Sequence, residues 1–252
     1  MRQIYKTCGA LFALTIYLFF SVNCAHCAPS PESTRAYRRG VAQMEHNRLR
    51  EAIPFFSEAI KLDPDNSLAY YQRGHASLMC EDTRSALLDL DRAIALDPTL
   101  AMAYFEKSRV YGELSKIELA IATCDKAIAV AGAAAPGFWF KDRGSWHLEL
   151  GHTDKALSDY SSSIRRDPKG PWGYFYRASI YSKTGRYQLA INDLSKAITL
   201  QPSANRSRFY QVRANCYDKL GKHNLARQDR NRADVGIVVD DWAGLGSDSN
   251  HK

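Results

Sequence analysis

The amino-acid sequence predicts an all-α protein, built as a right-handed solenoid of stacked helix pairs. One observation is helical periodicity, since the apolar residues between 190 and 198 recur at i, i+4, i+7 and i+8. Another is a fixed repeat length, since Pro64 and Pro98 lie 34 residues apart, as do Pro168 and Pro202. A period of this size is typical of supersecondary units that stack on their neighbours.

Residues 1–28 precede the repeats and have the layout of a secretory signal peptide. Arg2 and Lys6 give a positive start, and residues 8–22 form an uncharged and mostly apolar run. The run is shorter than the roughly 20 residues that a membrane-spanning helix needs. We therefore expect the leader to be cleaved and the chain to be exported, as a periplasmic or secreted protein. Retention of the leader as a helical anchor is an open alternative.

The cysteines give little support for metal or disulfide chemistry. Cys24 and Cys27 have the CxxC spacing of some metal and redox sites, but they lie in the leader rather than in a folded domain. Attachment of lipid to either of them after cleavage is a second alternative. Cys80, Cys124 and Cys216 remain, and an odd number argues against a disulfide framework.

Six repeats follow the leader, and each is expected to form two helices joined by a turn. Gly151, Gly185 and Gly221 lie at this turn, where a left-handed backbone conformation favours glycine. Two-residue insertions, 135–136 and 205–206, separate the third repeat from the fourth and the fifth from the sixth. The bounds of the repeats are 33–66, 67–100, 101–134, 137–170, 171–204 and 207–240.

Each repeat carries characteristic residues at fixed positions. The second repeat has Tyr70, Gly74, Ala86, Leu90, Ala93 and Pro98, and the fifth has Tyr174, Ala178, Tyr181, Ala190, Leu194, Ala197 and Pro202. In this pattern the repeats resemble the tetratricopeptide repeat family, over residues 33–240. Ser77 departs from the family at position 11, where an aromatic residue is usual. Arg230 departs at position 24, which is usually apolar, and predicts that the last repeat is a terminal cap.

Two charged positions recur with the repeats. Arginine occupies position 7 in five repeats, as Arg39, Arg73, Arg143, Arg177 and Arg213, and Lys107 replaces it in the third. Aspartate occupies position 23 in four of the repeats that have the arginine, as Asp89, Asp159, Asp193 and Asp229. We interpret these residues as ion pairs between the two helices of a repeat, with bidentate geometry possible. Display of the charges to a partner is the alternative.

The family resemblance implies that the first helix of each repeat lines a concave groove. An extended peptide would then contact aromatic rings in the first half of the groove and polar or basic groups at its end. Packing of the rings between neighbouring repeats is the alternative. The residues expected to bind peptide are Tyr37, Tyr71, His75, Phe105, Arg109, Lys141 and Phe175, and position 2 adds Leu68, Met102, Phe138, Trp172 and Arg208. Ser145 stands where the family's carboxylate clamp has Asn, so that clamp is not expected.

The net charge of +7 is concentrated near the C-terminus. Residues 201–235 hold eight Lys or Arg against three Asp. A basic patch of Arg208, Arg227, Arg230 and Arg232 is either a solvated helix face or a surface for an anionic membrane or glycan. Residues 241–252 are predicted to be a flexible tail.

No pattern of residues indicates catalysis, a metal or a cofactor. The histidines fall in different repeats, and the spacing of His147 and His152 is not that of a metal-ligand pair. Gly221-Lys222 lacks the rest of a P-loop. We therefore expect a non-enzymatic scaffold that binds a protein or peptide, and nucleic acid is not an expected partner. The alternative is an envelope adaptor that attaches to an anionic lipid or glycan surface through the last repeat.

Overall fold

The computed structural model describes residues 30–201 and 206–244, so the predicted signal peptide at 1–28 lies outside the described residues. Over these ranges the chain is entirely helical, without a strand. One short 3-10 helix, η1 (Gly132–Ala134), ends the third repeat. The α-helices are α2 (Pro31–Glu45), α3 (Leu49–Leu62), α4 (Ser67–Met79), α5 (Thr83–Leu96), α6 (Ala101–Glu113), α7 (Ile117–Ala131), α8 (Gly137–Glu149), α9 (Thr153–Arg166), α10 (Pro171–Lys183), α11 (Tyr187–Leu200), α12 (Ser207–Lys219) and α13 (His223–Gly244).

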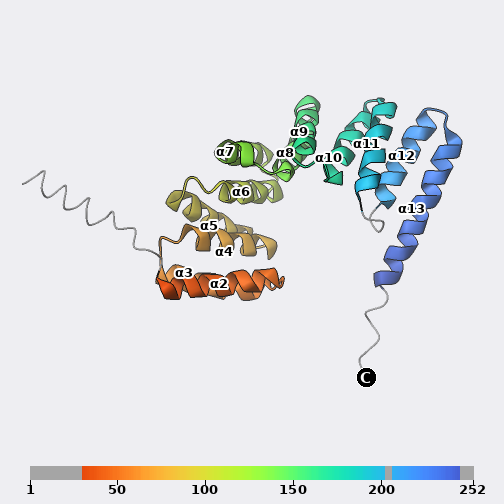
Figure 1. The fold of residues 1–252 in the computed structure, drawn as a ribbon. Coiled ribbons are helices and arrows are strands. Elements are labelled where there is room, and N and C mark those ends of the chain that lie inside the picture. The colour runs from red at the N-terminus through yellow and green to blue at the C-terminus, as the bar shows by residue number, and fades with distance from the viewer. Residues whose placement is uncertain (1–29, 202–205, 245–252) are drawn as a thin grey trace, which may run out of the picture. The chain divides into compact units, whose positions relative to one another are not determined.

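Consecutive helices pack side by side as pairs, one pair for each predicted repeat (Figure 1). The pairs belong to two compact units, which divide between Asp97 and Pro98. In the first unit, α2 lies beside α3 and α4 beside α5, and α3 also packs on α4. In the second unit, α6 to α13 continue the same succession of pairs. No helix in the described ranges is long and apolar enough to span a bilayer.

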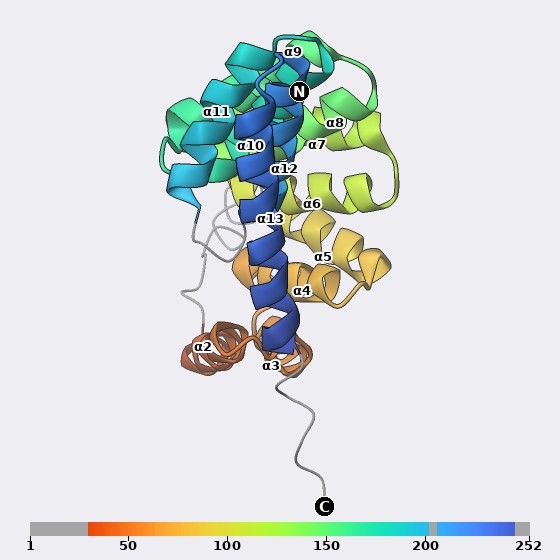
Figure 2. The same ribbon diagram turned by 90° about the vertical axis from the view of Figure 1, so that its right-hand side faces the viewer.

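The last helix of the second unit is longer than the others. Figure 2 shows α13 extending beyond the end of α12, its partner in the sixth repeat. It runs to Gly244, four residues into the segment 241–252 that the sequence predicted to be a tail. Residues 245–252 lie outside the described part of the chain.

The turn inside each repeat has one left-handed residue at position 15. Gly151, Gly185 and Gly221 adopt φ values of 75°, 75° and 71°, which confirms the role predicted for them. The first three repeats have the same conformation without glycine. There Asn47, Glu81 and Ser115 have φ values of 58°, 66° and 55°.

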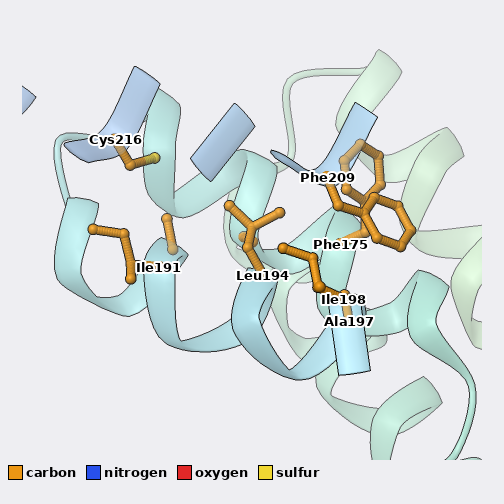
Figure 3. Close-up of a cluster of buried hydrophobic side chains, with 9 residues drawn as sticks. Phe175, Ile191, Leu194, Ala197, Ile198, Phe209 and Cys216 are labelled. Atoms are coloured by element: carbon orange, nitrogen blue, oxygen red, sulfur yellow. The ribbon is translucent and has the colours of Figure 1, made fainter. Parts of the chain in front are cut away.

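Both alanines and large apolar residues fill the core. Ala178 and Ala190 are fully buried where α10 and α11 pack together, and a small side chain there lets the helix backbones approach. Figure 3 shows the cluster between the fifth and sixth repeats, in which Leu194 and Ile198 lie beneath Phe175 and Phe209. The fifth repeat therefore completes its apolar core with side chains of the sixth.

The recurring charges at positions 7 and 23 are bidentate ion pairs, as predicted. In the second repeat, Arg73 donates from Nε and Nη2 to the two carboxylate oxygens of Asp89, both at 2.7 Å. Arg143–Asp159, Arg177–Asp193 and Arg213–Asp229 repeat this geometry. Hydrogen bonding to Asp89 raises the pKa of Arg73, and hydrogen bonding to Asp193 does the same for Arg177.

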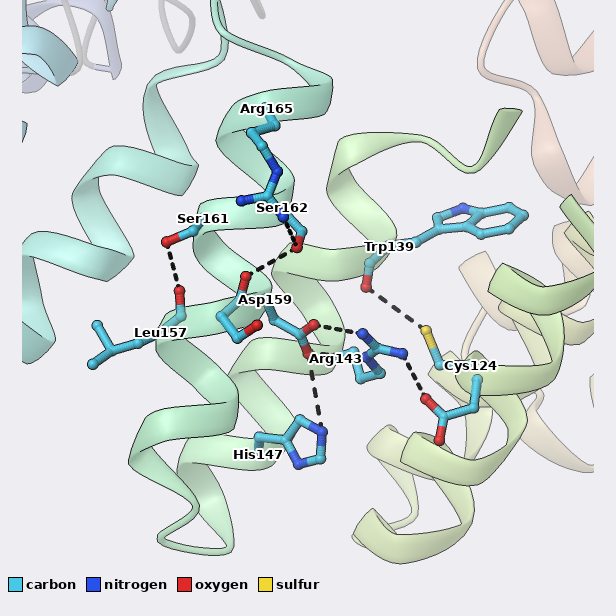
Figure 4. A network of polar contacts seen from close by, with 11 residues as sticks. Cys124, Trp139, Arg143, His147, Leu157, Asp159, Ser161, Ser162 and Arg165 are labelled. Atoms are coloured by element: carbon cyan, nitrogen blue, oxygen red, sulfur yellow. Dashed lines mark hydrogen bonds and ion pairs between the residues drawn. The ribbon is translucent and has the colours of Figure 1, made fainter. Parts of the chain in front are cut away.

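A third donor of each arginine reaches back to the preceding repeat. The Nη1 groups of Arg73, Arg177 and Arg213 donate to the hydroxyls of Ser57, Ser161 and Ser195, at 3.0, 3.1 and 2.9 Å. Arg143 uses the carboxylate of Asp125 in the same place, at 2.6 Å (Figure 4). Each arginine therefore holds its own two helices together and fixes them to the repeat before it. We call this arrangement the arginine clamp.

The thiols of the described residues are free, as the odd count indicated. Cys124 and Cys216 are buried, whereas Cys80 is partly exposed. Burial raises the pKa of Cys124 to about 12, so its thiolate is not available near neutral pH.

Candidate peptide-binding groove

Three first helices carry an exposed apolar side chain at position 2, one in the first unit and two in the second. Leu68 on α4 is 46% exposed, Phe138 on α8 is 45% exposed, and Trp172 on α10 is 40% exposed. Pro171 and Gly137 begin α10 and α8, so these two rings stand in the first turn of their helices. Exposed aromatic rings at such a place are suited to binding the side chains of a partner.

Two of the aromatic residues that were expected to bind peptide, both at position 5, are buried in the structure. Phe105 and Phe175 are only 1% and 2% exposed. Each ring stacks on the ring at position 3 of the following repeat, Phe105 on Trp139 at 5.0 Å and Phe175 on Phe209 at 4.8 Å. The packing role that was the alternative for these rings is the one that the structure shows.

The exposed rings are seated on these buried ones. Phe138 meets Phe105 edge to face at 5.2 Å, and Trp172 meets Phe209 in the same way at 5.4 Å. The guanidinium of Arg208 lies 5.1 Å from the centre of the Phe175 ring. Edge-to-face contacts hold the exposed rings in place, which reduces the entropy that a ligand must offset when it binds them.

The remaining predicted residues are partly exposed. In the first unit, Tyr37 packs against Phe56 at 5.8 Å, and Tyr71 stacks beside His75 at 6.3 Å. In the second unit, Arg109 pairs with the buried Glu106 at 3.0 Å, and Lys141 pairs with its neighbour Asp142 at 2.9 Å. These five side chains are accessible to a ligand from their own unit.

A hollow of about 290 Å³ opens between α6 and α8 in the second unit. Arg109 and Ser145, both at position 9, lie in its wall, together with Glu113, Asp142 and Trp146. Gly112 lets the indole of Trp146 lie close against α6, because a Cβ there would lie 2.7 Å from Nε1 of Trp146. The hollow thus offers both signs of charge and an indole face.

Trp146, Glu113 and Asp142 were not among the residues expected to bind. The sequence signal that could have found them is Gly112, a glycine inside a helix facing a tryptophan of the next repeat. Met102, the position-2 residue of α6, is partly buried and packs in the core cluster around Phe105 and Trp139.

The predicted basic patch is partly neutralised. Arg230 is ion-paired with Asp218, and Arg232 lies 3.6 Å from Asp229. Arg227 is exposed on α13, whereas Arg208 lies on α12 over Phe175. These carboxylates therefore neutralise part of the positive charge that would be required to bind an anionic surface.

His147, at position 11 of the fourth repeat, is a buried histidine. It lies against the clamp of the fourth repeat, with Nε2 4.0 Å from Asp159 (Figure 4). Burial lowers its pKa, and the attraction of Asp159 opposes that shift. Its ring lies 5.9 Å from that of His152, but the described residues contain no group of three His, Cys, Asp or Glu that could hold a metal ion.

Known sequences are similar to this chain within its repeats. Profiles of the tetratricopeptide repeat match residues 35–66 and 171–204, residues 55–87, and residues 101–133. Tetratricopeptide repeat protein 13 of Homo sapiens is 37% identical over 81 residues. That match covers 32% of this chain and 9% of the human protein, so the chain spans only a small part of this relative.

Solved structures are similar in fold. The crystal structure of PilW, described as a widely conserved type IV pilus biogenesis factor, has a TM-score of 0.69 at 18% identity and covers 79% of this chain and 91% of its own. YrrB, described as a TPR protein with an unusual peptide-binding site, has a TM-score of 0.59 at 17% identity, with coverages of 71% and 90%. At these identities the likeness concerns the fold alone.

Proposed function

The chain is a tetratricopeptide repeat protein, and from that premise we propose that it is a non-enzymatic scaffold that binds a peptide or protein through the first helices of its repeats. The observation that carries the proposal is the pair of exposed rings at position 2 of the fourth and fifth repeats. Phe138 and Trp172 are large, exposed and supported from beneath by buried rings. Large aromatic residues, tryptophan above all, are enriched among the residues that contribute most to binding.

The candidate site is most complete in the second unit. Trp172 provides an aromatic anchor, and Lys141 and Arg109 provide donors for the carbonyl or carboxylate oxygens of a ligand. An extended segment with apolar side chains separated by acidic or polar ones fits this combination.

The test is selection of binding peptides from a random library on the full chain, followed by affinity measurements by fluorescence anisotropy. Trp172→Ala should weaken the selected peptides by roughly 30-fold, the loss expected for an aromatic hot spot. Leu189→Ala is the matched control, because Leu189 is 46% exposed but lies on α11, a second helix of its repeat. Equal effects of the two substitutions would refute the assignment to the first helices.

Export remains part of the proposal and depends on residues 1–28 alone. N-terminal analysis of the protein purified from its own cells distinguishes the outcomes. Cleavage near Ala28 supports a signal peptide, an intact N-terminus supports an anchor, and a lipid on Cys24 or Cys27 supports a lipoprotein.

The adaptor role is the second candidate, and the exposure of Arg227 and Arg208 favours it. The ion pairs of Arg230 and Arg232 weaken it. Co-sedimentation with anionic vesicles tests it, since binding by a basic surface falls steeply with salt. Binding that survives high salt, or that Arg227→Ala leaves unchanged, would exclude the basic patch as the attachment surface.

A further inference from the structure

A second hollow, in the first unit, lies beside the arginine clamp of the second repeat. It has a volume of about 330 Å³, and Arg73, Ser77 and Asp89 contribute to its wall. Ile53 on α3 and Leu88 on α5 add apolar side chains to the wall. None of the positions that form the groove of the first helices contributes to it, so it is separate from the site proposed above.

One residue of the repeat pattern is unusually small where it lines this hollow. Position 11 is Ser77 in the second repeat, but tyrosine in the third, fifth and sixth. In the fifth and sixth repeats, Tyr181 and Tyr217 lie over the clamp, with the ring centres 5.9 and 5.8 Å from the guanidinium carbons of Arg177 and Arg213. The second repeat therefore has the cation and the carboxylate of the clamp, but a serine where those repeats carry a ring.

A ring at position 4 already lies near the guanidinium of Arg73, as in the sixth repeat. Tyr70 lies 5.7 Å from Arg73, as Tyr210 lies 5.6 Å from Arg213. Arg213 thus has a ring from position 4 and another from position 11, whereas Arg73 has only the first. A ring entering the hollow would restore the arrangement of the sixth repeat.

A second departure from the pattern lies at the same place. Position 22 is Leu88 in the second repeat, whereas the third to sixth repeats have Ala122, Ser158, Asn192 and Gln228 there. Leu88 is 66% exposed, and it lines the hollow. Compared with the other repeats, the second lacks a ring and has an exposed leucine around one hollow. A partner that supplies the ring would explain both differences.

The rim of the hollow also carries an acceptor. Asp82 caps α5 by accepting a hydrogen bond from the backbone N–H of Ser85 at 3.1 Å, and its side chain is otherwise exposed at the edge of the hollow. Hydrogen bonds from Ser85 lower the pKa of Asp82, so it is ionised near neutral pH. In the fifth repeat the equivalent residue is Arg186, over the Tyr181 ring. A carboxylate in place of that cation favours a ring that has an O–H to donate.

We propose that this hollow is a binding site for a tyrosine side chain of a partner protein, whose ring would lie against Arg73 between Ile53 and Leu88 and whose phenol would donate to Asp82. The volume is sufficient, since a cavity of roughly 150 Å³ accepts a benzene molecule. The site would give the chain a second point of attachment, made by two second helices and the first helix between them.

The probe is 4-methylphenol, titrated into the full chain and followed by protein-detected NMR. We expect saturable shifts confined to residues around Ser77, with a dissociation constant in the millimolar range for so small a ligand. The methyl ether of the same compound lacks the donor, and it should bind several-fold more weakly. Equal binding of the two compounds would overturn the assignment to tyrosine.

Ser77→Tyr provides the decisive variant, because it supplies the ring from within the chain. It should raise the melting temperature and abolish the saturable shifts, whereas Ser77→Ala should keep both as they are. A lower melting temperature for Ser77→Tyr would mean that the hollow does not accept a ring, and the proposal would fail. Leu88→Ala tests the site without filling it, and should weaken binding about three- to tenfold. Unchanged binding in both Ser77→Tyr and Leu88→Ala would place the probe elsewhere and refute the proposal.

Discussion

Removal of the arginine from one clamp should destabilise the second unit far more than removal of an ordinary surface arginine. Arg177 donates to both oxygens of Asp193 at 2.8 Å and to the hydroxyl of Ser161 at 3.1 Å. Arg177→Ala deletes all three hydrogen bonds and leaves the carboxylate of Asp193, whose side chain is 11% exposed, without its cation.

The magnitude follows from that burial. Breaking a buried ion pair by removing one partner costs roughly 3–5 kcal/mol. Arg177 is 22% exposed, so water and rearranged side chains screen part of the orphaned charge. We expect a loss of about 2.5 kcal/mol in the free energy of unfolding, which corresponds to a fall of roughly 5–10 °C in Tm.

The assay is urea unfolding of the full chain followed by far-UV circular dichroism. Arg165→Ala is the matched control, because exposed Arg165 donates only to Ser162 on its own helix, and it should cost less than about 0.5 kcal/mol. Ser161→Ala should cost about 0.5–1 kcal/mol, since it removes the link from Arg177 and a local hydrogen bond to the carbonyl of Leu157 but leaves the ion pair intact. If Arg177→Ala and Arg165→Ala had equal effects, the clamp would contribute nothing to stability and the reasoning would be wrong.

Three further predictions concern the turns, the buried histidine and the thiols. Ser115→Gly should stabilise the chain by about 0.5–1 kcal/mol, because Ser115 has a φ of 55° that glycine adopts without strain; a decrease in Tm would contradict this. The pKa of His147 is lowered from its usual value of 6.5 in the native protein, so as the pH falls the unfolded chain is protonated at this residue while the native side chain stays neutral. Stability should therefore fall as the pH drops from about 7.5 to 5.5. His147→Gln should reduce this fall in a pH series of urea titrations, and an unaltered pH dependence would refute the assignment. Iodoacetamide followed by mass spectrometry should label Cys80 before the buried Cys124, and equal labelling rates in the native protein would show that Cys124 is exposed.

Much of the fold could be predicted because it depends on local rules that recur every repeat. The positions of Gly151, Gly185 and Gly221 predicted left-handed turns, and the structure confirms them. The coincidence of Arg at position 7 with Asp at position 23 predicted the ion pairs, since two residues on facing helices of one repeat have a fixed relation. The links from the arginines to Ser161 and its equivalents were not predicted, because they depend on how one repeat sits on the next.

The candidate site was harder to predict for the same reason. Phe105 and Trp172 are both aromatic residues on first helices, and only the stacking of the next repeat decides that one is buried and the other exposed. Ser77 was recognised as a departure from the repeat pattern, but a sequence does not show whether a neighbouring side chain fills the space. The structure places a hollow beside Ser77, although the serine itself is only 4% exposed.

Because each arginine clamp also bonds to the preceding repeat, further repeats could be added to the stack. Arg213 donates a hydrogen bond to Ser195 in the repeat before it, as Arg177 donates to Ser161. A tandem duplication of residues 171–204 would therefore bring to its new junction an arginine, an aspartate and a serine already in register. A chain built in this way can gain length by copying one segment of DNA, and the added repeat would need no further substitution to be joined to its neighbours.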